Sequence, residues 1–336
     1  MKNLLTTLTL VSLSTVAAFA ATEENIHESR AAHPGGTIVV DVDFGSIDVV
    51  PGDNDKVVID AHRKIEASSK DKEEEYLKTA PIRITTEGDK VIVRATRRHE
   101  SLGSQIWNLL GHNRTEGHYT VRVPANFNAD LDTSGGAIST TGLTGTVKVD
   151  TSGGDLTFTR IHGDIHADTS GGDIKVNNCE GTTGLDTSGG NIEVTDGRGH
   201  LKSDTSGGKV TVMNFAGDAK VESSGGKLRL ANISGKLHAE TSGGAIEAIL
   251  PSPVADDVSL ETSAGAITVV TPPNAGLTID AETGAGSVRS DLPMSDVHTD
   301  EDSLKGTLNG GGKKLVLRSG AGSIQIVSAD HQTAQQ

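Results

Sequence analysis

One four-residue segment returns at a fixed interval through the middle of this chain. Thr-Ser-Gly-Gly, once as Ser-Ser-Gly-Gly, begins at Thr133 and recurs six times at intervals of 18 residues. Six equal intervals indicate a tandem repeat, and a period this short is typical of repeat architectures. The interval then becomes 21 residues for the variants at Thr262 and Thr283, and a last variant begins at Ser319. The seven regular copies begin at Thr133, Thr151, Thr169, Thr187, Thr205, Ser223 and Thr241.

Between these segments, apolar and polar residues alternate. Ile174 and Val176 flank a lysine, and aliphatic residues occupy the same two places in most other copies. An alternation of period two predicts β-strands. Eighteen residues are too few for an antiparallel propeller blade but suit one coil of a solenoid, in which matching residues stack about 4.8 Å apart. A single coil buries too little apolar surface to offset its ordering entropy, so the coils fold only as an array.

Two turns are predicted in each coil. We expect the paired glycines to supply positive φ angles at one corner, because glycine adopts them without steric cost. The second corner is marked by residues that tolerate turn geometry. They are Asn178, Asp196, Asn214 and Asn232.

The predicted fold is therefore all-β, a single-stranded parallel β-solenoid with 18–21 residues per coil. The general crossover rule favours a right-handed β-helix. We expect roughly a dozen coils and a length of about 55–60 Å.

The repeat also divides the chain. In chain order we expect a signal peptide at 1–20, a linker at 21–35, irregular N-terminal coils at 36–130, regular coils at 131–327 and a disordered tail at 328–336. Three segments interrupt the coils: a Lys- and Glu-rich insertion at 66–80 that suits a short exposed helix, an insertion at 99–117 and an acidic loop at 290–303.

The first residues predict export. Lys2 precedes a short apolar run, and Ala18-Phe19-Ala20 has the small-x-small pattern of a cleavage site. The run is too short to span a bilayer, and no second run of that length follows, so we expect no transmembrane segment in the mature chain. The sequence leaves periplasmic and extracellular locations open.

Composition limits the partners. The formal net charge is −15, from 30 basic and 45 acidic residues. An acidic chain repels nucleic acid, so we expect no nucleic-acid partner. Cys179 is the only cysteine, which excludes an intrachain disulfide. The 41 glycines and the 2% aromatic content fit a narrow aliphatic core with many tight turns.

The chain resembles a family of exported bacterial proteins of unknown function with β-strand repeats. Members of this family are labelled putative adhesins and are similar to autotransporter adhesin heads. The resemblance rests on units of the form S/T-G-x-G-x-I-x-V, here Ser-Gly-Gly-Asp-Leu-Thr-Phe at 152–158 and its copies. It also includes Val-Arg-Val-Pro at 121–124, which leads into residues 131–135. It covers residues 36–327 and implies a parallel β-helix.

The Asp-Thr-Ser-Gly-Gly segments also echo protease motifs. A catalytic group is needed once, beside partners fixed by a unique environment, so seven tandem copies predict a corner turn instead. We expect no catalytic residue.

An acidic residue precedes each of these segments, as Asp168 does before Thr169. Carboxylates stacked about 4.8 Å apart repel one another. Lys148, His166, Lys202, Lys220 and His238 each lie two residues before an acid, which favours ladders of ion pairs. Bound calcium is an open alternative, because calcium prefers oxygen ligands. His99, His112 and His118 match no zinc spacing, and we expect neither a metal nor a cofactor.

The insertion at 99–117 holds the best candidate contact surface, Ile106, Trp107, Leu109 and Leu110. These residues suit either a cap over the first coils or a docking surface for an envelope protein or glycan. The leading hypothesis is a non-catalytic, exported, adhesin-like interaction protein with a rigid solenoid surface. A polysaccharide-active β-helix enzyme and a calcium-responsive binding module are the alternatives.

Overall fold

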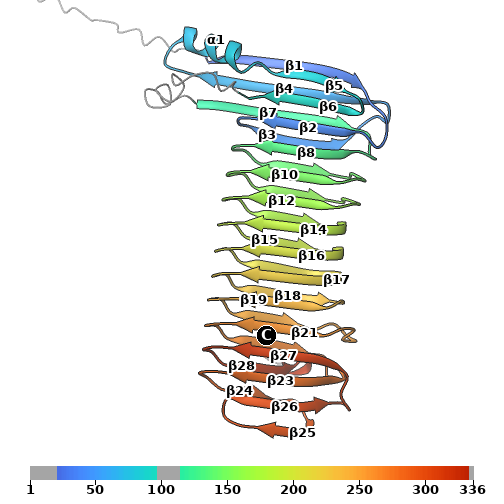
Figure 1. Ribbon diagram of the computed structural model, residues 1–336, viewed down its shortest axis with the longest axis vertical. Helices are drawn as coiled ribbons and strands as arrows, with labels where there is room; N and C mark the ends of the chain where they lie inside the picture. Colours follow the sequence, from blue (N-terminus) through green and yellow to red (C-terminus); the bar gives the residue numbers. More distant parts are fainter. Residues whose placement is uncertain (1–20, 97–113, 333–336) are drawn as a thin grey trace, which may run out of the picture.

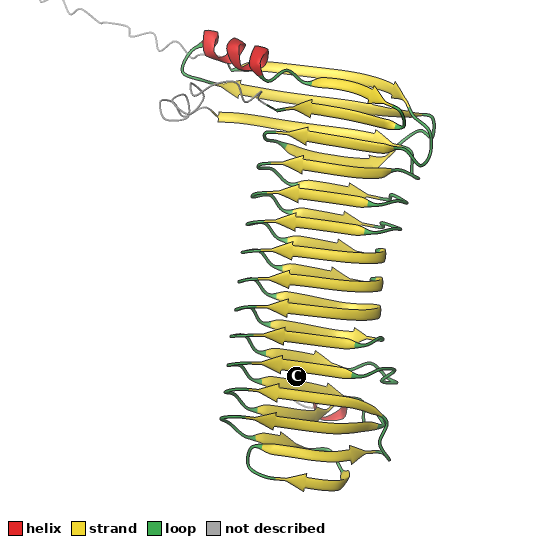
Figure 2. Ribbon diagram, in the orientation of Figure 1, coloured by secondary structure: helices red, strands yellow, loops and turns green. Residues whose placement is uncertain are grey.

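The chain is an elongated stack of strands in two facing sheets. The computed structural model describes residues 21–96 and 114–332, and Figures 1 and 2 show the coils piled along one axis. We call the two sheets sheet A and sheet B. The prediction of an all-β, solenoid-like architecture is confirmed, and the right-handed winding stays a prediction.

Each regular coil contributes one strand to each sheet. In one such coil, β12 (Ile165–Thr169) lies in sheet B and β13 (Ile174–Asn177) lies in sheet A. Both are parallel to their neighbours, and every residue pairs with those 18 positions away, as Ile174 does with Leu156 and Ile192. The columns read from the sequence are therefore real columns in space.

The regular strands follow one another directly along both sheets. Sheet B holds β8 (Asn128–Thr133), β10 (Val147–Thr151), β12, β14 (Glu180–Thr187), β16 (Arg198–Thr205), the second part of β17 (Val210–Ser223), β19 (Leu237–Thr241) and β21 (Val258–Thr262). Sheet A holds β9 (Ile138–Thr141), β11 (Leu156–Thr159), β13, β15 (Ile192–Thr195), the first part of β17, β18 (Leu228–Ile233), β20 (Ile246–Ile249) and β22 (Ile267–Thr271).

The core is a thin layer between the sheets. Ile165 from sheet B and Ile174 from sheet A are fully buried, and the same positions are buried in the neighbouring coils. Each fully buried aliphatic side chain contributes about 1.5–3 kcal/mol. The core is continuous through the stack, which is why the array can fold although one coil cannot.

The Thr-Ser-Gly-Gly segments build the corner that joins β12 to β13 and its equivalents, as predicted. The hydroxyl of Thr187 donates to the carbonyl of Gly172 in the preceding coil at 3.1 Å. The same hydroxyl accepts the amide of Gly190 at 3.2 Å. Thr169, Thr205 and Thr241 make the same two bonds and so satisfy backbone groups that the corner takes out of the sheets, whereas the Thr151 hydroxyl has no partner among the described residues.

The reason for the paired glycines differs from the prediction. At most copies neither glycine has a φ in the left-handed region; Gly136 and Gly286 are exceptions. The second glycine is required because the next coil lies against it: a methyl group on Gly190 would stand 1.8 Å from the carbonyl oxygen of Gly172. The expectation at the other corner is confirmed, since Asn178, Asp196, Asn214 and Asn232 all have φ between 53° and 56°.

The N-terminal coils do not stack in chain order. The coil of β2 (Thr37–Val42) and β3 (Ser46–Pro51) lies between two coils that come later in the chain. On one side it pairs with β6 (Lys90–Ala95) and β7 (Arg114–Val123), and on the other with β8 and β9.

The C-terminal coils show the same interleaving. After β22 the chain passes over one position to form β23 (Leu277–Thr283) and β24 (Val288–Ser290). It then returns, and β27 (Lys313–Ser319) and β28 (Ile324–Ser328) fill the place that was left.

Antiparallel strands close both ends, in contrast to the all-parallel expectation. Sheet A ends in β4 (Lys56–Glu66) and β1 (Thr22–Ala31), and sheet B begins with β5 (Arg83–Glu87). At the other end, β26 (Ser303–Leu308) and β25 (Met294–Thr299) extend sheet B. The segments 21–35 and 290–303, expected to be a linker and a loop, therefore supply strands. A short helix, α3 (Ala329–Gln332), occupies part of the expected disordered tail.

The insertion at 66–80 forms a helix, α1 (Lys70–Thr79), as the sequence suggests, but the helix is only partly exposed. Tyr76 packs with Ile65 and Ala80 in a small second core, and the carboxylate of Glu73 is buried. The hydroxyl of Thr22 in β1 donates to Glu73 at 2.6 Å. The helix thus fastens β1 to the end of the solenoid.

Candidate binding face on sheet A

The contact residues predicted from the sequence, Ile106, Trp107, Leu109 and Leu110, lie outside the described residues. The strands that flank this insertion are β6, which ends at Ala95, and β7, which begins at Arg114. The insertion therefore leaves and rejoins the solenoid at its N-terminal end, near α1. The signal peptide expected at 1–20 also lies outside the described residues.

The acidic column runs along the outer face of sheet B. Asp150 pairs in register with Asp132 and Asp168, so neighbouring carboxylates lie on adjacent strands. Burial and the charges of Asp186 and Glu222 raise the pKa of Asp204 above its usual value.

Basic residues oppose this repulsion in part. The ammonium of Lys220 forms an ion pair with Glu222 at 3.0 Å. Lys202 and Lys220 also act against the rise in the pKa of Asp204. Within residues 21–96 and 114–332, no group of three or more His, Cys, Asp or Glu side chains is arranged to hold a metal ion.

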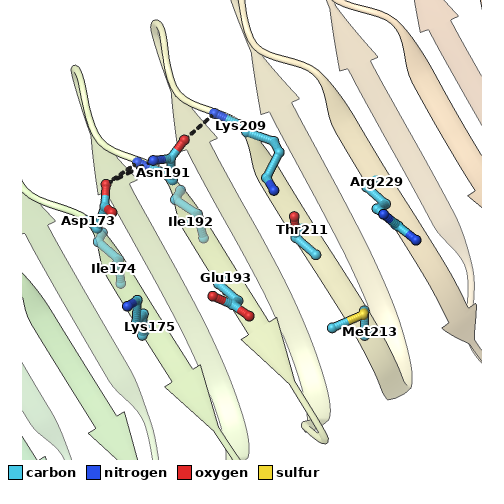
Figure 3. Close-up of a pocket in the computed structure, with 10 residues that line it drawn as sticks. All are labelled: Asp173, Ile174, Lys175, Asn191, Ile192, Glu193, Lys209, Thr211, Met213 and Arg229. Carbon is cyan, nitrogen blue, oxygen red and sulfur yellow. Dashed lines mark hydrogen bonds between the residues drawn. The ribbon is translucent and has the colours of Figure 1, made fainter.

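The outer face of sheet A carries a shallow depression of about 690 Å³ across β13, β15, β17 and β18 (Figure 3). Three cationic side chains surround it: Lys175 from the coil of β13, and Lys209 and Arg229 from the coils of β17 and β18. The charged and polar residues that line it are Asp173, Lys175, Asn191, Glu193, Lys209, Thr211 and Arg229, with Met213 at one side.

A side-chain ladder fixes one border of this depression. Oδ1 of Asp173 accepts the backbone amide of Asn191 at 2.8 Å and its side-chain amide at 3.1 Å. Oδ1 of Asn191 in turn accepts the backbone amide of Lys209 at 2.9 Å. Figure 3 shows these bonds running from coil to coil. Because each bond joins adjacent coils, the border keeps the strand spacing of the sheet.

Thr211 forms the floor of the depression. Its side chain belongs to the outward column of sheet A, but only 7% of the residue is exposed. Its hydroxyl has no hydrogen-bond partner among the described residues. A buried hydroxyl without a partner costs about 1–3 kcal/mol, so this atom is a place where a ligand gains by supplying a hydrogen bond.

The cations around Thr211 are also free of anionic partners. Lys175, Lys209 and Arg229 are exposed, and in the described part of the chain none of them lies within 4.0 Å of a carboxylate oxygen. The neighbouring Lys227, by contrast, is paired with Glu247 at 2.5 Å. The depression therefore combines three cations that form no ion pair in the described residues with the two carboxylates of Asp173 and Glu193.

An apolar stripe lies beside the depression on the same face. Its members pair in register from one strand to the next, and Ile249 is the most exposed, at 38%. The stripe consists of Met213, Ala231, Ile249, Val270 and Val327.

Sequence reasoning did not single out the depression or the stripe. Both were readable as columns at 18-residue spacing, because Lys175, Glu193, Thr211 and Arg229 occupy the same place in four successive copies. The sequence does not show over which outward column the depression forms, since that depends on the lengths and directions of the neighbouring side chains.

These features define a two-sheet β-solenoid with a polar depression on the outer face of one sheet. The chain belongs to the Toastrack DUF4097 family, whose sequence pattern matches residues 37–327. No curated protein matches the chain. In the described residues, no helix has the length and apolar character needed to cross a membrane.

Two solved structures are similar to this chain. A putative cell adhesion protein from Clostridium sporogenes is 13% identical, with 91% of this chain and 100% of that chain covered and a TM-score of 0.20. A putative adhesin from Bacteroides fragilis is 9% identical, with 91% and 97% covered and a TM-score of 0.34.

Proposed function

We propose that this protein is a non-catalytic, adhesin-like binding scaffold that works outside the cytoplasm. The observation that carries the proposal is the in-register array of outward side chains. Residues 18 positions apart lie side by side on parallel strands over the whole regular part of the stack. On sheet B this array presents carboxylates at one-coil intervals, and on sheet A it presents charged and polar side chains at the same spacing, which suits an extended partner with a repeating structure.

The architecture favours rigidity in this role. Each strand of the regular coils is hydrogen-bonded on both sides, and the exposed edges are confined to the two ends. Antiparallel strands cover those ends, and the terminal strand β25 carries a bulge near Asp296 that discourages pairing with another chain. Binding to a preformed surface avoids the entropy cost of ordering loops.

The proposal includes the insertion at 99–117 as a docking element, with Trp107 and Leu110 as its anchors. Buried aromatic residues commonly dominate interface energies. The insertion joins β6 to β7, two strands at the N-terminal end of the stack.

The test is capture of envelope components by the full chain. Trp107→Ser with Leu110→Ser should leave the solenoid folded, as judged by its circular dichroism and melting temperature, and should abolish capture. Trp107→Phe, which keeps an aromatic side chain, is the matched control and should retain most of it. Unchanged capture by the double serine variant would refute the docking role.

The same preparation tests the non-catalytic part of the proposal. The full chain is incubated with neutral and acidic glycans, with calcium and with a chelator, and the products are examined for chain shortening. Turnover of any glycan would overturn the proposal in favour of a polysaccharide-active enzyme. A melting temperature that rises with calcium would instead favour a calcium-responsive module.

A further inference from the structure

We propose that the depression on sheet A around Thr211 is a binding site for a linear polysaccharide that carries carboxylate groups. This inference rests on the proposed binding function and names its ligand class. The sugar carboxylates would pair with Lys175, Lys209 and Arg229, and a sugar hydroxyl would bond to the hydroxyl of Thr211.

Charge complementarity is the first argument. Three exposed cations gather on this face without ion-pair partners in the described part of the chain, although the protein has a formal net charge of −15. The acidic column lies on the outer face of the opposite sheet. At physiological salt the Debye length is about 8 Å, so the potential that a ligand meets in the depression is set mainly by its own charges, three cations against the carboxylates of Asp173 and Glu193.

The floor of the site is the second argument. The Thr211 hydroxyl is buried and lacks a partner among residues 21–96 and 114–332. Figure 3 shows the Lys209 side chain extending from the corner toward Thr211, and a long flexible side chain is easily displaced. A ligand hydroxyl that reaches Thr211 would satisfy a group that the protein leaves unsatisfied.

The shape of the site is the third argument. Lys175 and Arg229 lie three coils apart, which is about 14 Å at the strand spacing. Lys209 lies between them along the axis, in the neighbouring column of Asp173 and Asn191, so the three cations are spread along the solenoid and do not converge on one point. A single phosphate or carboxylate cannot contact all three, whereas a linear polymer can.

The mixture of groups favours a sugar polymer over an acidic peptide. The carboxylates of Asp173 and Glu193 stand among the cations and accept hydrogen bonds from hydroxyl groups. They would repel the carboxylates of either polymer, but only the sugar has hydroxyl groups that donate to them in return. Met213 adds a small apolar contact at the side of the depression, which suits the C–H face of a sugar ring.

The probe is polygalacturonate, and binding to the full chain is measured by isothermal titration calorimetry. Lys175→Gln, Lys209→Gln and Arg229→Gln together should weaken binding by about tenfold or more, because charge-assisted hydrogen bonds are lost. The matched control is Lys148→Gln, Lys202→Gln and Lys220→Gln, which removes the same charge from sheet B and should leave the affinity within about twofold. Equal losses in both triple variants would overturn the proposal.

A second variant tests the floor of the site without a change of charge. Thr211→Val removes a buried, unpartnered hydroxyl, so the melting temperature should stay the same or rise. Polygalacturonate should nevertheless bind several-fold more weakly. Unchanged affinity in this folded variant contradicts the assigned role of Thr211.

Two further comparisons test whether the site is specific for a sugar polymer and whether it can fail independently of the proposed scaffold function. Poly-L-glutamate should bind at least about tenfold more weakly than polygalacturonate, and equal binding would show that charge alone is recognised. If polygalacturonate does not bind while envelope capture still depends on Trp107, the sheet A site fails and the scaffold function stands. If neither is observed, both fail.

Discussion

The α-carbon of Gly190 lies directly against the carbonyl group of Gly172, so that a methyl group there would stand 1.8 Å from the oxygen. The same approach recurs through the regular coils, for example between Gly208 and Gly190 at 1.7 Å. Backbone therefore packs on backbone at this corner, and the first glycine of each pair has no such contact. The repeat needs its second glycine for space and not for a positive φ.

We therefore expect Gly190→Ala to be strongly destabilising, by about 3 kcal/mol or more, because the coil can relieve the clash only by moving the backbone away from the coil beside it. Gly189→Ala is the matched control, since its methyl group would meet nothing nearer than the Ser170 oxygen at 3.8 Å. Urea unfolding of both variants checks this. Equal stability of the two would show that the corner is more compliant than the structure indicates.

The opposite corner depends on a left-handed backbone. Asn178 has φ of 53°, and its exposed side chain is not branched at Cβ. Asn178→Val should lower the free energy of unfolding by about 1–2 kcal/mol, because a β-branched residue is strained there. Asn178→Gly should change it by less than about 0.5 kcal/mol. A valine variant as stable as the glycine variant would contradict the φ-based explanation.

The acidic column makes stability depend on pH. Burial, followed by Asp186 and Glu222, raises the pKa of Asp204 in the folded state. Folding therefore disfavours the charged form of Asp204. The free energy of unfolding falls as the pH rises from the usual pKa of an aspartate to this raised pKa. Asp204→Asn should raise the free energy of unfolding at pH 7 by about 0.5 kcal/mol.

This gain should shrink as the pH falls through the raised pKa of Asp204 and vanish once the carboxyl group is protonated in both states. Melting curves at several pH values measure it. Lys202→Gln should lower the free energy of unfolding at pH 7, since Lys202 counteracts the rise in the pKa of Asp204. An asparagine variant that is less stable than the parent at pH 7 would count against repulsion in the column.

The N-terminal end depends on one buried ion pair. Arg63 in β4 is fully buried, its Nε donates to Glu24 of β1 at 2.9 Å, and its Nη1 donates to the carbonyl of Ala80 at 2.7 Å. Arg63→Met should lower the free energy of unfolding by about 3 kcal/mol, because Glu24 and the Ala80 carbonyl lose their donor.

Adding Glu24→Gln to Arg63→Met should recover part of this loss, since no carboxylate is then left without its cation. Hydrogen exchange should place the weakening in β1 and β4 and leave the regular coils protected. Uniform loss of protection along the stack would show that the end closure and the coils unfold as one unit.

The regular coils were predictable from the sequence because every local signal repeats. Ile174 and Val176 recur as aliphatic residues at 18-residue spacing, and the corner residues keep their places, so one register satisfies all coils at once. The unpaired hydroxyl of Thr211 was not predictable, because Thr157, three copies earlier in the same column, is also a threonine. Its burial depends on the side chains around it in the folded structure, where Lys209, Arg229 and Met213 line the same depression.

The sequence by itself determined the strands, their columns and the corner positions of Asn178 and the paired glycines. Only the tertiary structure decided the order of the end coils, where β2 and β27 lie between strands distant in the chain. The physical reason is that an alternating strand pattern specifies which face is buried but not which parallel neighbour it joins. Where successive repeats are equivalent, each strand pairs with the strands of the adjacent repeats. Where the repeats differ, long-range packing determines which strands pair.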